Sequence, residues 1–193
     1  MFKQTSYTDN ITFFQKLRSL DYILLICILS LGIISSFSMY STDGGELLYH
    51  SKSHIIRFFL FFFMMIAMSF LNIKFWHSTG YIFYILVLIF LLWASFYGIT
   101  ASGSQRWINL YFINLQPSEL MKVAIIMCFA KLYHRSQMQN INNLKNISVS
   151  MIIILMPIFL VLSQPDLGTS ILIALSGLVV LWLAGLNIKY FIY

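Results

Sequence analysis

Long apolar runs separated by short polar segments set the pattern of this chain. Six runs are long enough, or nearly so, to cross a bilayer as helices, at about 21–41, 55–73, 80–98, 117–133, 148–163 and 167–185. Pro157 interrupts the fifth run, which we therefore expect to form a short or kinked helix. The pattern predicts an all-α fold, a polytopic transmembrane helix bundle that covers residues 1–193 as a single unit.

Composition supports a membrane protein. Of the 193 residues, 60% are hydrophobic and only 9% are charged, which is unlike a soluble globular domain. No small-residue cleavage site follows the first apolar run, so we expect that run to stay as a span. Cys27 and Cys128 lie within predicted spans without a partner motif, and we interpret both as packing residues.

The cations predict an orientation in the membrane. The positive-inside rule places both termini in the cytoplasm and the 42–54 and 99–116 loops outside. The net charge of +6 is then expected at the cytoplasmic face, near anionic membrane lipids, and nothing indicates nucleic-acid binding. The cations on the predicted inner side are Lys3, Lys16, Arg18, Lys74, Lys131, Arg135, Lys145 and Lys189.

The fourth run opens with a polar motif, Gln116-Pro117-Ser118-Glu119-Leu120-Met121-Lys122. Pro117 suits the first position of a helix, and Glu119 favours the positive end of the helix dipole. Glu119 and Lys122 are three residues apart and share a helix face. Two interpretations stay open: Lys122 reaches back to the interface and pairs with Glu119, or these charges line a cavity or a substrate path.

Two further polar motifs fall on the same predicted outer side. The loop before Gln116 carries Arg106 beside Trp107, where the planar guanidinium suits a phosphate and the indole suits the membrane interface. A simple interfacial anchor is the alternative. The sixth run follows Gln164-Pro165-Asp166-Leu167-Gly168-Thr169, in which we expect Asp166 to cap the helix. Three polar clusters on one side predict a shared site.

These segments together resemble a known family. The loop Gly103-Ser104-Gln105-Arg106-Trp107-Ile108, the helix start at 116–122 and the motif at 164–169 look like the signature segments of the SEDS family, in the same order and spacing. Asp21-Tyr22-Ile23-Leu24-Leu25 is similar to the start of that family's first span. The resemblance covers nearly the whole chain, and the loop motif favours the rod-shape branch over the division and sporulation branches.

The resemblance implies a peptidoglycan glycosyltransferase of the bacterial plasma membrane. Such a protein polymerises lipid II on the outer face during cell elongation, with a class B penicillin-binding protein and the elongation machinery as partners. The expected substrate-binding residues are Arg106, Gln116, Ser118, Glu119, Lys122 and Asp166. Arg106 and Lys122 are the candidate cations for the departing pyrophosphate, with a divalent metal as an alternative. We expect Glu119 to hold Lys122 in place and Asp166 to support the fold.

The chain departs from the family in its number of spans. The family is a bundle of about ten spans, and its catalytic Asp lies in a large outer loop of the C-terminal half. This sequence has six runs, so we assign no catalytic residue and expect little activity from the chain alone. Three alternatives remain: a flippase for lipid-linked precursors, a non-catalytic partner-binding role, and an intramembrane hydrolase using Ser118 and Lys122, for which no oxyanion-hole signal is apparent.

Overall fold

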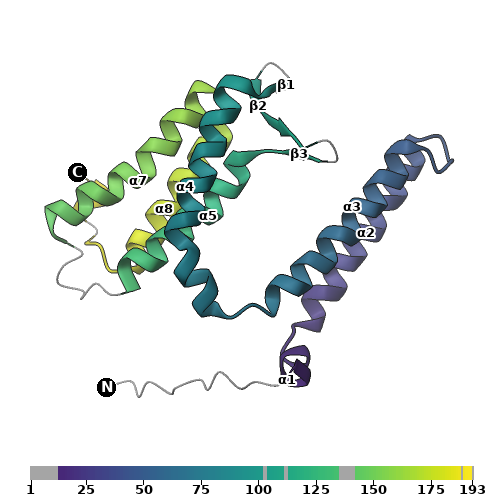
Figure 1. The fold of residues 1–193 in the computed structure, drawn as a ribbon, viewed down its shortest axis with the longest axis horizontal. Helices are drawn as coiled ribbons and strands as arrows, with labels where there is room; N and C mark the ends of the chain where they lie inside the picture. Colours follow the sequence, from purple (N-terminus) through teal and green to yellow (C-terminus); the bar gives the residue numbers. More distant parts are fainter. Residues whose placement is uncertain (1–12, 102–103, 111–112, 135–141, 188, 193) are drawn as a thin grey trace. The chain divides into compact units, whose positions relative to one another are not determined.

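A computed structural model describes residues 13–101, 104–110, 113–134, 142–187 and 189–192. Lys3, Gly103 of the loop motif and Arg135 lie outside these ranges. The elements in chain order are α1 (Phe13–Arg18), α2 (Tyr22–Thr42), α3 (Tyr49–Ser69), α4 (Ile73–Tyr97), β1 (Ile99–Ala101), β2 (Ser104–Asn109), β3 (Asn114–Leu115), α5 (Pro117–His134), α7 (Leu144–Ser163), α8 (Leu167–Leu183) and α9 (Lys189–Ile192) (Figure 1).

The chain divides into two compact units, residues 1–71 and 72–193. In the first unit, α2 and α3 form a helical hairpin (Figure 1). Asp21 caps α2 by accepting a hydrogen bond from the Leu24 backbone N–H, at 3.1 Å. A Cβ atom at Gly32 would lie 2.0 Å from the ring of Phe58. Glycine at this position therefore lets the Phe58 ring pack directly on the backbone of α2.

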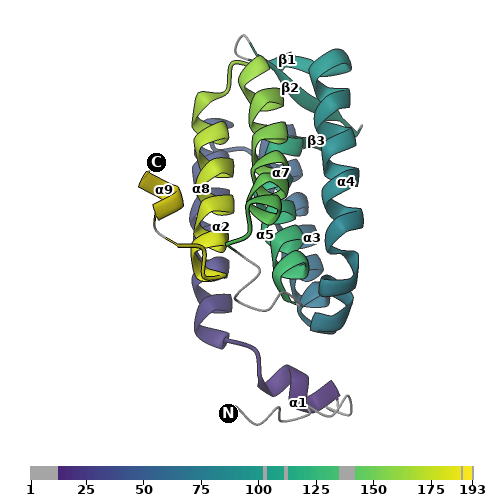
Figure 2. The same cartoon turned by 90° about the vertical axis from the view of Figure 1, so that its left-hand side faces the viewer.

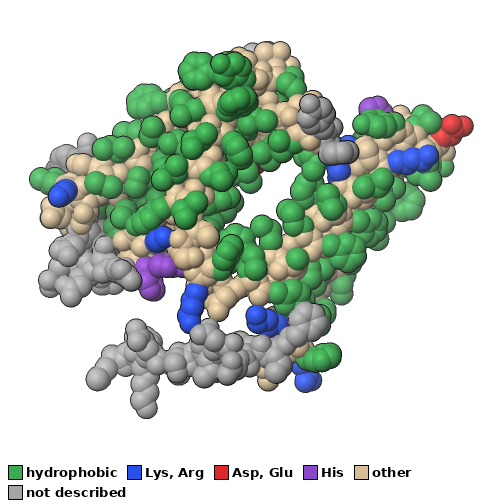
Figure 3. Space-filling view, viewed as in Figure 1, with side chains coloured by type: hydrophobic (Ala, Val, Ile, Leu, Met, Phe, Trp, Pro, Cys, Tyr) green, Lys and Arg blue, Asp and Glu red, His purple; other side chains and the backbone are tan. Residues whose placement is uncertain are grey.

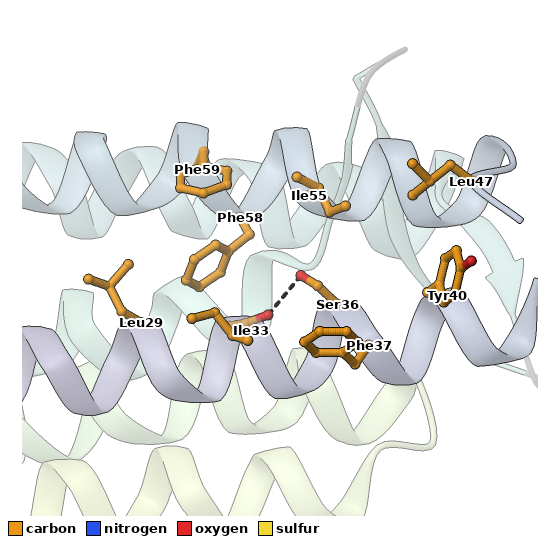
Figure 4. A pocket seen from close by; sticks show the side chains of 10 residues that line it. Leu29, Ile33, Ser36, Phe37, Tyr40, Leu47, Ile55, Phe58 and Phe59 are labelled. Carbon is orange, nitrogen blue, oxygen red and sulfur yellow. Dashed lines mark hydrogen bonds between the residues drawn. The ribbon is translucent and has the colours of Figure 1, made fainter. Parts of the chain in front are cut away.

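A groove of about 390 Å³ runs between α2 and α3 of the hairpin (Figure 4). The one hydroxyl near its centre, that of Ser36, donates to the Gly32 carbonyl at 2.7 Å and is thereby satisfied within α2. The side chains labelled around it are mostly aliphatic or aromatic: Leu29, Ile33, Phe37, Tyr40, Leu47, Ile55, Phe58 and Phe59. The hairpin thus leaves part of its own interface unfilled.

In the second unit, α4, α5, α7 and α8 pack side by side around a common core, as two views show (Figures 1 and 2). Gly80 of α4 lies so close to α5 that an added Cβ would meet the Met127 carbonyl oxygen at 2.7 Å. The two helices can approach this closely because glycine has no side chain. The largest fully buried side chains are Leu91, Met121, Ile125, Phe129, Ile173 and Leu181.

A three-stranded antiparallel sheet lies at the end of the bundle where α4 ends and α5 begins (Figure 1). Its strand order is β1-β2-β3, with Ile99 opposite Trp107 and Ile108 opposite Leu115. The sequence predicted only a loop here. The helical class is nevertheless confirmed, and the sheet is a short addition that carries Arg106 on its central strand.

Four of the described helices are long and apolar enough to cross a membrane: α2, α3, α4 and α7. The apolar α8 is shorter, with 17 residues. The 18 residues of α5 include three charged side chains, those of Glu119, Lys122 and Lys131. The number of spans and their orientation therefore stay predictions.

Several helices begin earlier than the apolar runs. The first residues of α3, α4 and α7 are Tyr49, Ile73 and Leu144, whereas the runs begin near 55, 80 and 148. Polar residues in the first turns lower the local hydropathy without breaking the helix, so hydropathy places the starts too late. Of the two expectations for the fifth run, a short helix is wrong, because α7 has 20 residues with Pro157 inside it, and a kink stays a prediction. Neighbouring helices can satisfy the carbonyl that a proline leaves free.

Candidate functional site

The carboxylate of Asp166 is the centre of a polar cluster at the sheet end of the bundle. Asp166 caps α8, as predicted, because its Oδ1 accepts a hydrogen bond from the Thr169 backbone N–H at 3.1 Å. Its Oδ2 accepts from Nη1 of Arg106 at 3.0 Å and from Nε2 of Gln116 at 3.3 Å. Three polar motifs that are far apart in the sequence therefore meet at one side chain.

The sheet and the start of α5 deliver the partners of Asp166. Arg106 lies on β2, and Gln116 lies between β3 and the first residue of α5. The amide of Gln116 also donates to Oγ of Ser118, at 3.1 Å, and Ser118 is buried. α5 begins at Pro117, as the motif predicts. A rigid helix start and a strand thus hold both donors against the carboxylate.

The charges of Arg106 and Asp166 are partly shielded from solvent. Their side chains are 27% and 10% exposed. Burial raises the pKa of the Asp166 carboxyl, but hydrogen bonds from Thr169 and Arg106, together with the Arg106 charge, outweigh this effect and hold the pKa below its usual range. Asp166 is therefore ionised at neutral pH. It orients the guanidinium and cannot serve as a proton donor there.

Arg106 keeps donor capacity beyond its ion pair. A guanidinium has five N–H donors in a planar fork. Its Nε atom is buried and has no hydrogen-bond partner among the described residues. Buried polar atoms are nearly always satisfied, so an unpaired one calls for a ligand or another group at that position. The site can accordingly offer N–H groups to an anion while Asp166 fixes the geometry.

Glu119 and Lys122 form a separate pair on the first turns of α5. Nζ of Lys122 donates to Oε2 of Glu119 at 2.9 Å, which confirms that the two residues share a face and pair. Within the described ranges no side-chain hydrogen bond links this pair to Asp166. The structure thus joins four of the six predicted substrate residues directly and leaves the other two as neighbours in sequence on α5.

The role of Gln164 did not emerge from the sequence. This side chain is 4% exposed, and its Nε2 donates to Oγ of Ser95 at 2.7 Å and to the Leu91 carbonyl at 3.3 Å. It ties the corner between α7 and α8 to α4, two residues before Asp166. The signal was present, since Gln164 belongs to the quoted motif, but a sequence does not show which carbonyl a distant amide reaches.

The donor set around Asp166 does not fit a divalent metal. The cluster holds one carboxylate, and both of its oxygens already accept hydrogen bonds. Divalent cations such as Mg²⁺ take several oxygen ligands. In the part of the chain that the structure describes, no three or more His, Cys, Asp or Glu residues gather in a way that could hold a metal ion.

Comparison with known proteins defines the class of this chain. Residues 17–193 match the family model FTSW_RODA_SPOVE, described as "Cell cycle protein". The chain therefore belongs to this family, the SEDS family.

Two individual relatives show how similar the chain is to members of this family. The peptidoglycan glycosyltransferase MrdB of Escherichia coli K12 is 34% identical over 176 residues, which are 91% of this chain and 46% of that protein. A probable peptidoglycan glycosyltransferase FtsW of Buchnera aphidicola subsp. Baizongia pistaciae is 30% identical over 171 residues, covering 86% and 45%. The chain spans about half the length of the curated relatives it matches.

Solved structures share the fold. The crystal structure of the rod shape determining protein RodA of Thermus thermophilus superimposes with a TM-score of 0.74 at 20% identity, over 90% of this chain and 56% of that one. A chain from a structure of a peptidoglycan synthase complex, described as coordinating polymerization and crosslinking, gives a TM-score of 0.77 at 20% identity, over 90% and 50%. At this identity the similarity establishes the fold alone.

Proposed function

We propose that this chain forms part of a RodA-type peptidoglycan glycosyltransferase and supplies its binding site for the pyrophosphate of lipid II. The chain would act at the outer face of a bacterial plasma membrane during elongation. Family membership and the 34% identity to MrdB support the class of reaction. The polymerising activity of the whole protein, its substrate and its partners are parts of this proposal.

The observation that carries the proposal is the convergence of Arg106 and Gln116 on Asp166. When a glycosidic bond forms from a lipid-linked sugar, the departing pyrophosphate gains negative charge. Donors that are already oriented stabilise such charge without reorganising. Asp166 holds the guanidinium in one orientation, and the donors that face away from this carboxylate remain to bind phosphate oxygens.

Lys122 is the proposed second cation of this site. It follows Gln116 on α5 by less than two turns, and its side chain is 24% exposed. Glu119 holds the ammonium group at 2.9 Å in the structure. In the proposed complex, a phosphate oxygen competes with the Glu119 carboxylate, which is 55% exposed and free to turn into solvent. No described residue is proposed as the base for the acceptor hydroxyl.

Lipid II binding tests the site directly. Arg106→Gln keeps a polar side chain and removes the charge and the fork, so we expect purified protein in detergent to bind fluorescent lipid II about 10-fold more weakly. Arg57→Gln is the matched control, because Arg57 is exposed and its guanidinium donates within α3 to the Ser53 carbonyl and hydroxyl. Equal affinity of the two variants would contradict the proposed site.

A chimera tests the reaction. In the chimera, this chain replaces the matching part of Escherichia coli MrdB. Glycan formation from lipid II is then measured on gels. We expect polymer from the chimera and from its Arg57→Gln form, and little from its Arg106→Gln form. Translocation of lipid II in vesicles without any polymer would instead favour the flippase interpretation. Clear polymer from the 193-residue chain alone would overturn the expectation that further chain is needed.

A partner that crosslinks glycan strands is the second part of the proposal. One of the similar structures is that of a peptidoglycan synthase complex in which polymerization and crosslinking are coordinated. We propose that this chain likewise assembles with a class B penicillin-binding protein of the elongation machinery. Co-purification of the chimera with that partner from membranes is the expected result. If cells that carry the chimera lose their rod shape while the chimera still co-purifies with the partner, partner binding does not depend on catalysis.

A further inference from the structure

A groove of about 520 Å³ lies at the end of the bundle where α4 begins and α5 ends, on the opposite end from the sheet. Basic side chains enter it from both helices, namely Lys74 and His77 from α4 and His134 from α5. The rings of His77 and His134 meet edge to face, with centroids 4.6 Å apart. Figure 3 shows Lys and His side chains in this part of the bundle, in blue and purple, among green apolar ones.

One imidazole nitrogen in this groove lacks a partner. Nε2 of His77 is buried, and it makes no hydrogen bond to any residue that the structure describes. Burying an imidazole nitrogen without a partner is costly, so such an atom points to a partner group outside the described residues, such as a ligand. His77 lies one turn after Lys74 on α4, so an acceptor near the start of the helix can reach both side chains.

The surroundings favour an anion. α4 begins here, with the Asn72 side chain accepting from the Lys74 backbone N–H at 3.2 Å, and a helix start carries partial positive charge. The sequence has no acid within α4, and Glu119 lies about 22 Å away along α5. Lys131 is engaged elsewhere, because its Nζ donates to the Ser78 carbonyl at 2.5 Å and lies over the Tyr81 ring.

The remaining walls favour a lipid over a soluble anion. Ile73, Met127 and Ala130 line the groove with apolar surface, and Trp76 stands in the first turn of α4, a position typical of the membrane interface. α4 is also one of the helices long and apolar enough to cross a membrane. Basic pockets between transmembrane helices are suited to acidic lipid headgroups.

We propose that this groove binds the phosphate of an anionic phospholipid, with Lys74, His77 and His134 around the headgroup and the apolar walls against the upper part of an acyl chain. The site is distinct from the cluster around Asp166 and does not depend on the glycosyltransferase proposal. Lipid bound there would hold the start of α4 against the end of α5. The protein would thereby respond to the acidic lipid content of its membrane.

The second capped helix of the bundle provides a matched control. α7 begins as α4 does, since Asn143 caps it by accepting from the backbone N–H of Lys145, as Asn72 does from that of Lys74. Lys145 is exposed. Cap, spacing and charge are the same, whereas the paired imidazoles and the groove belong to α4. Comparing substitutions of the two lysines therefore separates a built site from a helix start with a nearby cation.

Native mass spectrometry of the full chain with added phosphatidylglycerol or phosphatidylcholine tests the proposal. We expect phosphatidylglycerol to bind about 10-fold more tightly, and the double variant Lys74→Gln, His77→Gln to lose that preference. Lys145→Gln should change the affinity less than about 2-fold. Equal affinity for the two lipids, or an equal loss in the Lys145 variant, would overturn the proposal.

Two further arms keep the test decisive. Inorganic phosphate at matched ionic strength should leave the lipid bound, and its displacement of phosphatidylglycerol would assign the groove to a soluble anion instead. If the double variant fails to fold by circular dichroism, His134→Gln replaces it, because His134 is a residue at the end of α5 whose ring faces His77. Unchanged lipid preference in a folded His134→Gln variant would overturn the role of the paired imidazoles.

Discussion

The α2–α3 hairpin and the α4–α8 bundle differ in what covers their apolar side chains. In the bundle, α4 has buried residues from Gly80 to Ala94 and α5 from Pro117 to Phe129, where the two helices pack against each other and against α7 and α8. Among the described residues of the hairpin helices, α2 buries only Gly32, and α3 buries Ser51 and Phe62. The bundle makes a core of its own, whereas α2 and α3 bury few side chains against each other.

This difference separates two sources of stability. A membrane removes much of the hydrophobic drive between helices, since lipid tails are as apolar as leucine, and packing with polar contacts then decides the association. The bundle has both, with close backbone approaches and the Asp166 cluster at one end. The hairpin has a close approach at Gly32 and a groove beside it. We therefore expect substitutions in the bundle to cost more than equivalent ones in the hairpin.

The largest expected contrast is between two phenylalanines. Phe129 of α5 is fully buried, whereas Phe63 of α3 is 64% exposed. Phe129→Ala should lower the free energy of unfolding by about 3–5 kcal/mol, because it leaves a cavity that the helices cannot close. Phe63→Ala should cost under about 0.5 kcal/mol. Unfolding in one detergent, followed by circular dichroism, measures both, and similar losses would remove the distinction between the two units.

Glycine substitutions sharpen the same contrast. An added methyl group at Gly80 meets the backbone carbonyl of Met127, which can move only if α5 moves, so Gly80→Ala should cost about 1–3 kcal/mol. At Gly32 the obstacle is the ring of Phe58, a side chain that can turn into the neighbouring groove. Gly32→Ala should therefore cost under about 1 kcal/mol. A larger loss at Gly32 would mean that the hairpin is packed as rigidly as the bundle.

The parts of the fold that could be predicted are those encoded locally. Pro117 marked the start of α5, and the capping role of Asp166 followed from an acid just before an apolar run. The pairing of Glu119 with Lys122 followed from helical spacing. Asn72 and Asn143 cap α4 and α7 and could have marked the starts of these helices equally well. Hydropathy alone does not detect such polar caps.

The rest depended on contacts between distant residues. The pairing of Ile99 with Trp107 creates the strands of the sheet, and such short strands have no apolar period to reveal them. The sequence grouped Arg106 with Lys122 as two cations for one phosphate. That grouping stays a prediction. The structure adds that Arg106 pairs with Asp166, sixty residues further along the chain, where the carboxylate compensates the charge of a partly buried guanidinium. Which carboxylate lies next to Arg106 is decided by the topology of the fold, which the sequence pattern does not show.

A buried amide offers a test of moderate size. Gln164→Leu removes the hydrogen bonds to Ser95 and to the Leu91 carbonyl, and it should lower the free energy of unfolding by about 1–2 kcal/mol. In the hairpin, Ser36→Ala removes a bond made within a single helix and should cost under about 0.5 kcal/mol. Hydrogen exchange of α4 amides near Leu91 should rise in the Gln164 variant alone. Unchanged exchange there would show that the corner is held by apolar packing.

The smallest expected effect is the loss of stability in acid. Asp166 of the bundle and Asp43 of the hairpin are the two carboxyl groups to compare. Burial raises the pKa of Asp166, but hydrogen bonds and Arg106 lower it further, so the net pKa is below the ordinary value. Hydrogen bonds from Ser51 to the half-buried Asp43 lower its pKa as well. A carboxyl whose pKa is lower in the folded state stabilises that state above the unfolded pKa of about 3.9. This contribution disappears as the pH falls through the folded pKa.

Asp166→Asn isolates that contribution, because asparagine caps a helix as well as aspartate does but cannot ionise. We expect the melting temperature of this variant to fall below that of the unaltered protein at neutral pH, by the equivalent of about 1 kcal/mol or less, and the difference to shrink as the pH falls from about 3.9 through the folded pKa of Asp166. Asp43→Asn should shift the melting temperature less, since the hydrogen bonds that lower the pKa of Asp43 come from the uncharged Ser51. A gap at Asp166 that does not shrink at all as the pH falls below about 3.9 would show that the side chain acts by shape and capping, with its charge contributing nothing to the stability of the bundle.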